Sequence, residues 1–311
     1  MIAWITGANG FIGRHLVRTL ADAGKAVHGI GHGAIPDAER RRLGYDSWLN
    51  GEIDTTNLDI LARQSGLPSV IFHLAGGSSV GQSIAQPHED FARTVASTAR
   101  LLEWLRRCAP ECRLIAASSA AVYGAHHTRP IAEASETLPV SPYGHHKLMM
   151  EQLCRSFAVS YSLRSVMVRL FSVYGPGLRK QLLWDLGSRL GAGERTLTLG
   201  GTGAELRDWT HVRDAVRLLA TIAGMPQRES FQVINGGGSI PTPVAEVARS
   251  LVKSFGGNNE IAVQFSGVAR PGDPFSLVAD GASLRALPFS FEIQLAEGIA
   301  DYVDWLKGQA S

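Results

Sequence analysis

Tyr143 and Lys147 are the residues whose types and spacing most directly suggest chemistry. They lie four positions apart in Ser-Pro-Tyr-Gly-His-His-Lys (141–147), on one face of a helix that Pro142 is expected to open. A tyrosine ordinarily has a pKa of roughly 10, and a lysine ammonium beside it favours the phenolate and lowers that pKa. Ser118 and Ser119 follow an apolar run that predicts a buried strand. They are therefore candidates for side chains that border the same site at the end of this strand. These side chains predict an acid–base centre at a strand end.

A glycine-rich turn near the N-terminus predicts a dinucleotide site. Gly7, Gly10 and Gly13 are spaced three apart between an apolar strand and an amphipathic helix. Glycines let the backbone approach a pyrophosphate closely, and the first turn of the helix presents free N–H groups to the anion. A bound nicotinamide would add a second positive charge that favours the phenolate of Tyr143.

The end of the second predicted strand bears on which dinucleotide binds. A carboxylate there would bind the ribose 2′-hydroxyl and repel a 2′-phosphate, but the sequence has Gly31-His32-Gly33. His32 or one of the arginines 40–42 could pair with a 2′-phosphate. NADP(H) is therefore favoured, with NAD(H) as the alternative. A simpler interpretation is that Gly31 only permits a turn.

The elements that must position these residues alternate between strands and helices. Apolar runs at 2–5, 26–30, 70–74, 113–117 and 165–170 predict strands, and helical spacing of apolar residues separates several of them. Continuous apolar strands indicate a parallel sheet that is covered on both faces. The sequence predicts an α/β fold with a doubly wound parallel Rossmann-type sheet.

The regular alternation of strands and helices ends after about residue 170, where Gly and Pro clusters separate shorter segments. We expect a dinucleotide-binding domain over 1–170 and a smaller substrate-binding lobe over 171–311. The lobe is mainly 171–210 and 237–311, and 211–236 are expected to return to the first domain.

Composition narrows the function classes. The chain has 311 residues, a net charge of +2 and three cysteines without metal-ligand spacing. No apolar run reaches the roughly 18 residues of a membrane span. We expect a cytoplasmic protein that binds neither nucleic acid nor a membrane. The adjacent pairs His126-His127 and His145-His146 have diverging side chains, so no metal site is predicted.

Several motifs together resemble those of the extended short-chain dehydrogenase/reductases, the group of nucleotide-sugar epimerases, dehydratases and reductases. The resemblance covers nearly the whole chain. The motifs, in the order of the family, are TGANGFIG (6–13), HLAG (73–76), SSAAVYG (118–124), YGHHK (143–147), RLFSVYGPG (169–177), RDWTHVRD (207–214) and RPGD (270–273).

The resemblance implies roles for individual residues. Ser119 would hydrogen-bond the reacting sugar oxygen, Tyr143 would be the acid/base, and Lys147 would bind the nicotinamide ribose. The residues implied to contact the cofactor are Gly7, Gly10, Phe11, Ile12, Gly13, His32, Glu52, Ile53, Leu74, Ala75, Gly76, Tyr143 and Lys147. The residues implied to contact a nucleotide-diphosphate sugar are Ser79, Ser119, Ser172, Arg207 and Arg270, with the two arginines on the diphosphate. The family usually has Asn where this chain has Ser172 and Thr94.

Ala120 and Ala121 restrict the reaction. Dehydratases of the family carry a glutamate, often as an Asp-Glu pair, directly after the Ser/Thr, and alanine has no proton to exchange. A 4,6-dehydratase is therefore not expected. Two reactions remain: NADPH-dependent reduction of a nucleotide-linked 4-keto-6-deoxyhexose, which we favour, and 4-epimerisation with tightly bound NAD.

Two other functions are compatible with the sequence, and a homodimer is predicted. Gly77-Ser78-Ser79-Val80-Gly81 matches the G-x-S-x-G nucleophile motif of hydrolases, and a non-catalytic NADP-sensing regulator could use the same fold. Apolar residues in the predicted helices 88–108 and 142–158 exceed what one buried face needs. These helices, with the resemblance, predict a homodimer.

Overall fold

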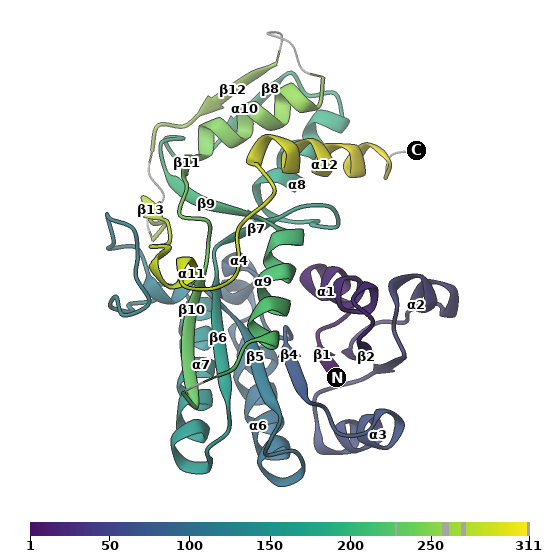
Figure 1. Cartoon of the computed structure of the whole chain (residues 1–311). Helices are drawn as coiled ribbons and strands as arrows, with labels where there is room; N and C mark the ends of the chain where they lie inside the picture. Colours follow the sequence, from purple (N-terminus) through teal and green to yellow (C-terminus); the bar gives the residue numbers. More distant parts are fainter. Residues whose placement is uncertain (228, 257–260, 269–271, 310–311) are drawn as a thin grey trace. The chain divides into compact units, whose positions relative to one another are not determined.

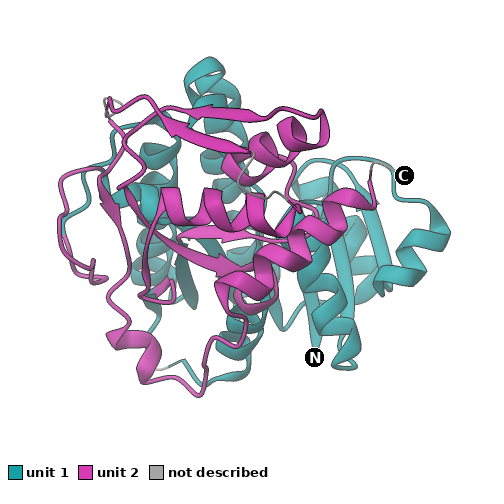
Figure 2. Ribbon diagram, turned by 90° about the horizontal axis from the view of Figure 1, so that it is seen from above, with its two compact units in different colours: residues 1–124, 136–170, 216–234 teal, residues 125–135, 171–215, 235–311 magenta. Residues whose placement is uncertain are grey.

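The structure, a computed structural model, describes residues 1–227, 229–256, 261–268 and 272–309. The chain forms two compact units, coloured separately in Figure 2. The first unit contains residues 1–124, 136–170 and 216–234. The second contains residues 125–135, 171–215 and 235–311.

A seven-stranded sheet forms the centre of the first unit, with the strand order β10-β6-β5-β4-β1-β2-β3 (Figure 1). The strands are β1 (Ile2–Thr6), β2 (Ala26–Gly31), β3 (Ser47–Asn50), β4 (Val70–His73), β5 (Arg113–Ser119), β6 (Ser165–Leu170) and β10 (Phe231–Gly236). Neighbouring strands from β3 to β6 pair in parallel. The predicted α/β fold with a doubly wound parallel sheet is confirmed. The order reverses between β1 and β4, and ligands of such sheets bind beyond the carboxyl ends of the strands at this point.

Helices connect these strands. They are α1 (Phe11–Asp22), α2 (Asp37–Leu43), α3 (Thr55–Ser65), α4 (Val80–Ala85), α5 (Pro87–Phe91), α6 (Ser97–Cys108), α7 (Pro142–Tyr161) and α9 (Val212–Gly224), whose first turn belongs to the second unit. Helix α6 packs between α3 and α7. Trp4 of β1 contacts Trp104 of α6, with ring centroids 5.2 Å apart, and both side chains are buried in the core on this face.

The helix predicted over 88–108 contains a π-helical turn. This turn, Ala92–Ala96, lies between α5 and α6, and the residues on both sides of it are helical. Such turns occur frequently at functional sites. Here the turn contains Thr94, whose Oγ1 accepts a hydrogen bond from the Gly77 nitrogen at 2.8 Å. The irregular turn thus supports the loop that follows β4.

The second unit contains short strands and four helices among its described residues. The strands are β7 (Ser172–Tyr174), β8 (Thr196–Leu199), β9 (Leu206–His211), β11 (Pro241–Pro243), β12 (Ala262–Phe265) and β13 (Ser276–Leu277), and the helices are α8 (Gln181–Gly191), α10 (Val244–Ser254), α11 (Ala282–Arg285) and α12 (Leu295–Lys307). Strand β9 pairs with β7, β11 and β13. The fully buried Asp208 of β9 accepts hydrogen bonds from the backbone N–H groups of Gly238, Ser239 and Ala279.

The limits of the units differ from the predicted domain limits. Residues 125–135 belong to the second unit, because the backbone of Ile131 forms a bridge with Ala279 and accepts a hydrogen bond from the Asn235 side chain. The returning segment is 216–234 rather than 211–236. The assignment of dinucleotide to the first unit and substrate to the second stays a prediction.

Candidate active site

The glycine-rich turn after β1 packs closely against neighbouring backbone. Gly7 has φ +67°, and a Cβ there would lie 2.7 Å from the Ala75 nitrogen. A Cβ at Gly13 would lie 2.4 Å from the Gly7 carbonyl oxygen. Gly10 is the N-cap of α1, and no described side chain caps this end of the helix. The first turn of α1, where Phe11 and Ile12 lie, therefore presents N–H groups suited to a phosphate.

The loop after β4 meets this turn. Leu74 and Ala75 pack against Gly7, as the distance between Ala75 and a Cβ at Gly7 indicates. Gly76 has φ +144°, and a Cβ there would lie 3.2 Å from the Nζ of Lys147 and equally close to Oγ1 of Thr94. The structure thus brings the predicted cofactor residues of 7–13 and 74–76 together with Lys147.

Tyr143, Ser119 and Lys147 form one cluster. Ser119 ends β5, Tyr143 lies in the first turn of α7, and the Ser119 hydroxyl lies close enough to lower the pKa of Tyr143. Lys147 is buried and donates from Nζ to the carbonyl of Ala117 at 2.9 Å, while Nζ lies 5.9 Å from the centroid of the Tyr143 ring. Strand β5 therefore supplies both a hydroxyl and a carbonyl that hold the helix residues in place.

The protein alone does not lower the pKa of Tyr143, contrary to the expectation from the lysine. Burial raises the pKa of Tyr143, the Ser119 hydroxyl lowers it in part, and the Asp90 carboxylate raises it. Burial dominates because it removes water from the phenolate. A positive charge brought by a bound nicotinamide would act in the opposite direction.

The region at the ends of β2 and β3 gives a physical reason for the missing carboxylate. Gly31 is the last residue of β2, and a Cβ there would lie 3.3 Å from the Trp48 ring. Its role in the turn that follows stays a prediction. Nε2 of His32 lies 3.6 Å from Oε1 of Glu52, and both side chains are exposed, whereas Ile53 is buried.

Two of the three arginines that could have marked a 2′-phosphate have acidic partners close in sequence. Arg40 pairs with Asp37, and Arg42 lies 3.8 Å from Glu39, all within α2. These interactions are typical of a solvated helix face. They give no independent support to the predicted preference for NADP.

A network of buried polar groups behind the cluster is not evident from sequence patterns. Arg169 at the end of β6 makes two hydrogen bonds to Glu151 of α7, of 2.9 and 2.6 Å, and one to the Tyr123 hydroxyl at 2.8 Å. Ser118 donates to the same Glu151 carboxylate at 2.5 Å. Because Glu151 lies one turn after Lys147, the network fixes α7 against the strands that carry Ser118 and Arg169.

His73, at the end of β4, is a second buried group of this kind. Its Nδ1 lies 2.7 Å from Oγ1 of Thr6 and its Nε2 lies 2.9 Å from Oγ1 of Thr98. The Thr98 hydroxyl donates to the Thr94 carbonyl, so Nε2 of His73 carries the ring proton and Nδ1 accepts from Thr6. Burial and the charge of Lys147 lower the pKa of His73 to about 3, which keeps the ring neutral.

The remaining predicted substrate residues lie apart in the chain. Ser79 is the N-cap of α4 in extended backbone and accepts from the Gln82 nitrogen at 3.4 Å, an ordinary capping geometry. Ser172 begins β7 and Arg207 lies in β9, where Nη2 contacts Asp273 at 2.6 Å. Arg270 lies outside the described residues. Ser172 and Arg207 belong to the second unit, and their roles stay predictions.

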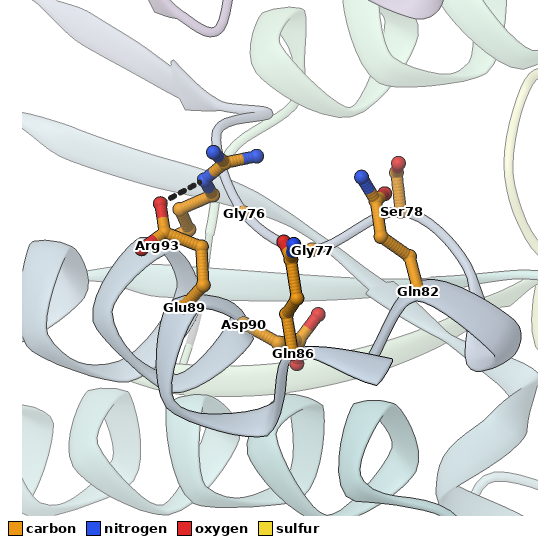
Figure 3. A pocket seen from close by; sticks show the side chains of 8 residues that line it. All are labelled: Gly76, Gly77, Ser78, Gln82, Gln86, Glu89, Asp90 and Arg93. Atoms are coloured by element: carbon orange, nitrogen blue, oxygen red, sulfur yellow. Dashed lines mark hydrogen bonds and ion pairs between the residues drawn. The ribbon is translucent and has the colours of Figure 1, made fainter. Parts of the chain in front are cut away.

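A small pocket in the first unit borders the loop after β4 (Figure 3). Its lining is polar and consists of Gly76, Gly77, Ser78, Gln82, Gln86, Glu89, Asp90 and Arg93. Within the described part of the chain, no group of three or more His, Cys, Asp or Glu side chains could hold a metal ion. Over the same residues, no helix is long and apolar enough to cross a membrane.

Comparisons with known proteins agree with this geometry. The model of the NAD dependent epimerase/dehydratase family matches residues 3–237. A UDP-glucose 4-epimerase of Azospirillum brasilense is 30% identical and is aligned over 90% of this chain and 84% of its own length.

Solved structures are similar over almost the whole chain. MoeE5 in complex with UDP-glucuronic acid and NAD is 32% identical, with a TM-score of 0.88 and coverage of 99% of this chain and 100% of its own. The UDP-glucuronic acid 4-epimerase of Bacillus cereus, solved with UDP-glucuronic acid and NAD, is 26% identical, with a TM-score of 0.88 and coverage of 99% and 100%. DesIV, a dTDP-glucose 4,6-dehydratase of Streptomyces venezuelae with NAD and TYD bound, is 27% identical, with a TM-score of 0.86 and coverage of 99% and 97%.

The predicted resemblance to the extended short-chain dehydrogenase/reductases is confirmed. The comparisons favour the epimerase alternative and NAD, and they do not support the NADPH-dependent reductase that the sequence analysis preferred. On the family match, the fold and the shared motifs, this chain belongs to the NAD-dependent epimerase/dehydratase family.

Proposed function

We propose that the chain is a UDP-sugar 4-epimerase that keeps NAD bound throughout its reaction cycle. The observation that carries the proposal is the cluster of Ser119, Tyr143 and Lys147 beside the glycine loops of the first unit. Similarity to a UDP-glucose 4-epimerase and to complexes of UDP-sugars with NAD supports the choice of substrate class and cofactor.

The residues of the chain would hold the dinucleotide as follows. The backbone around Gly7 and Gly13, where a Cβ would collide with carbonyl oxygens or the Ala75 backbone, accommodates the pyrophosphate at the start of α1. Lys147 and Gly76 lie beside the acid–base cluster, and the nicotinamide riboside would bind there. Bound NAD supplies a reversible hydride acceptor at C4 of the sugar.

The side chains of the cluster handle the proton. Tyr143, as the phenolate, accepts the proton of the 4-hydroxyl while the hydrogen at C4 is removed as hydride. Ser119 would hold the 4-oxygen by a hydrogen bond, and the positive charge of bound NAD would favour the phenolate. Once the 4-keto sugar presents its opposite face, C4 would regain its hydrogen and Tyr143 would return the proton to the 4-oxygen. The reaction leaves no net change in protons or electrons.

The residues after Ser119 support epimerisation over dehydration. Ala120 and Ala121 begin a 3₁₀ turn, Ala120–Tyr123, directly behind Ser119. Neither side chain can exchange a proton with C5 or with a leaving hydroxyl, as elimination of water would require. The similarity to a dehydratase therefore supports the fold and the cofactor more than the reaction.

A direct experiment tests this proposal. The cofactor released from the purified protein by denaturation is identified by mass spectrometry. The protein is then incubated with UDP-glucose or UDP-glucuronic acid without added cofactor, and C4 epimers are separated by chromatography. We expect NAD and interconversion of epimers of one of the sugars. Stoichiometric consumption of added NADPH with a 4-keto nucleotide sugar would establish the reductase instead.

We also propose that the chain forms a homodimer through the exposed apolar side chains of α7 and its surroundings. Met150 of α7 is fully buried, but Met149 is 41% exposed, and Phe91 of α5 is 39% exposed. Exposed apolar side chains on adjacent helices are typical of an interface. Light scattering at micromolar concentration should give the mass of a dimer, and Met149→Glu should shift it toward the monomer.

A further inference from the structure

A buried acid–imidazole pair lies next to the acid–base cluster and has no role in the mechanism above. Oδ2 of Asp90 in α5 lies 2.6 Å from Nδ1 of His146 in α7. The side chains are only 6% and 12% exposed, respectively. The Phe91 ring packs edge-on against the imidazole, with centroids 5.6 Å apart. A short contact between two buried titratable groups is a charge-assisted hydrogen bond of well-defined geometry.

The absence of a side chain at Gly77 leaves space for the Asp90 carboxylate. A Cβ at Gly77 would lie 1.7 Å from Oδ1 of Asp90, so any other residue at 77 would displace the carboxylate. The nitrogen of Gly77 is in turn held by Thr94 of the π-helical turn. Asp90 lines the same pocket as Gly76 and Gly77 (Figure 3). The loop after β4, which contacts Lys147, thus also contacts the carboxylate.

The pair is connected to Tyr143 by position and by charge. His146 directly precedes Lys147 on α7 and lies three residues after Tyr143. The backbone N–H of Tyr143 donates to Oγ of Ser83 at 3.0 Å, which fixes the start of α7 against α4. The negative charge of Asp90 raises the pKa of Tyr143.

Among the described residues, groups that bear on the charge of Tyr143 lie on α7, α5 and β5. Lys147 and His146 lie on α7, Asp90 lies on α5, and Ser119 contributes a neutral hydroxyl from β5. The other carboxylate of the pocket, Glu89, pairs with Arg93 at 2.8 Å and is half exposed. Its charge is screened by solvent and by its partner.

We propose that Asp90 and His146 form a positioning pair that sets the electrostatic potential at the Tyr143 hydroxyl, and thereby the pH range in which Tyr143 takes and returns its proton. The inference rests on the proposed role of Tyr143 as acid/base. The carboxylate disfavours the phenolate, so it holds Tyr143 protonated until substrate and cofactor are in place. His146 holds the carboxylate in position through the 2.6 Å contact.

The test compares Asp90→Asn with the matched control Glu89→Gln, which removes a neighbouring carboxylate of the same pocket. Asparagine has the shape of aspartate and can still accept from His146 through Oδ1. In the NAD-bound protein, the ultraviolet absorbance of tyrosinate is followed against pH, and the same titration of each variant carrying Tyr143→Phe is subtracted. In parallel, kcat/KM for epimerisation is measured from pH 5 to 9.

Asp90→Asn should move the tyrosinate midpoint to lower pH, because it removes a negative charge that disfavours the phenolate. The acid limb of kcat/KM should move by the same amount, whereas Glu89→Gln should leave both unchanged. The double variant Asp90→Asn/His146→Asn retains an amide–amide hydrogen bond without charge and should shift the midpoint in the same direction. It keeps the inference testable if the single variant does not fold.

The outcomes separate this inference from the proposed function. A midpoint that does not move, or moves upward, in both Asp90 variants would overturn the positioning role. A uniform loss of activity at all pH values with an unmoved midpoint would also overturn it, because a merely structural role has that effect. Absence of epimerase activity in the unmodified protein would contradict the proposed function, while the tyrosinate titration would still test the pair.

Discussion

Substitution of Arg169 by methionine tests whether the network behind the active site holds the first unit together. Arg169 and Glu151 are 6% and 5% exposed, and the pair makes two hydrogen bonds to each other. Methionine fills much of the same space but leaves the Glu151 carboxylate buried with the Ser118 hydroxyl as its remaining described partner. It also removes the donor to the Tyr123 hydroxyl.

The magnitude follows from burial. Breaking a buried ion pair by removing one partner ordinarily costs about 3–5 kcal/mol, because an uncompensated charge stays buried. The matched control is Arg93→Met, whose pair with Glu89 is half exposed on both sides and is separated by one helical turn. Such pairs contribute about 0.3–0.5 kcal/mol. The two substitutions should therefore differ by roughly tenfold in their effect on the free energy of unfolding.

The assay is urea unfolding followed by tryptophan fluorescence and by circular dichroism. The double variant Glu151→Met/Arg169→Met should be more stable than Arg169→Met alone, since no charge remains buried. A loss below about 1 kcal/mol for Arg169→Met, equal to that of Arg93→Met, would refute the reasoning. A double variant whose loss equals the sum of the single losses would refute it as well.

Three further predictions concern the site. Tyr143→Phe should keep NAD binding but reduce kcat by about 10²–10⁴-fold, because only the proton transfer is lost; unchanged kcat would show that another group is the acid/base. Gly13→Val should abolish retention of NAD on gel filtration, since a Cβ there would lie 2.4 Å from the Gly7 oxygen; a variant that folds and keeps stoichiometric NAD would contradict the role of this turn. His73, whose pKa is lowered to about 3, binds fewer protons folded than unfolded, so the free energy of unfolding should fall as pH decreases from about 6.5 toward 3. His73→Asn should lower stability at pH 7 but flatten this dependence, and an equally steep dependence in the variant would exclude His73 as its source.

Local patterns predict the parts of the candidate site that are encoded within one segment. The glycines 7, 10 and 13 lie in one strand–turn–helix, and Tyr143 and Lys147 lie one helical turn apart. The role of Ser119 is implied by the resemblance to the family. The structure places these groups together because parallel strands end at the same edge of the sheet.

Partners contributed by distant segments could not be predicted in this way. Asp90 and His146 are 56 positions apart, and neither belongs to a pattern that indicates pairing. The choice of cofactor could not be predicted from residue 31 alone. A Cβ at Gly31 would lie 3.3 Å from the Trp48 ring of β3, a four-residue strand whose alternation is too short to stand out in the sequence.

The fate of the hydrogen at C4 tests the central claim most directly. UDP-glucose and UDP-glucuronic acid deuterated at C4 are incubated separately with the purified protein, without added cofactor, and the products are examined by NMR. We predict that one of them gives its C4 epimer with the deuterium retained at C4, because the hydride is removed and returned within the same site. Deuterium at C6 would indicate dehydration, and absence of an epimer from both sugars would contradict the proposed 4-epimerase.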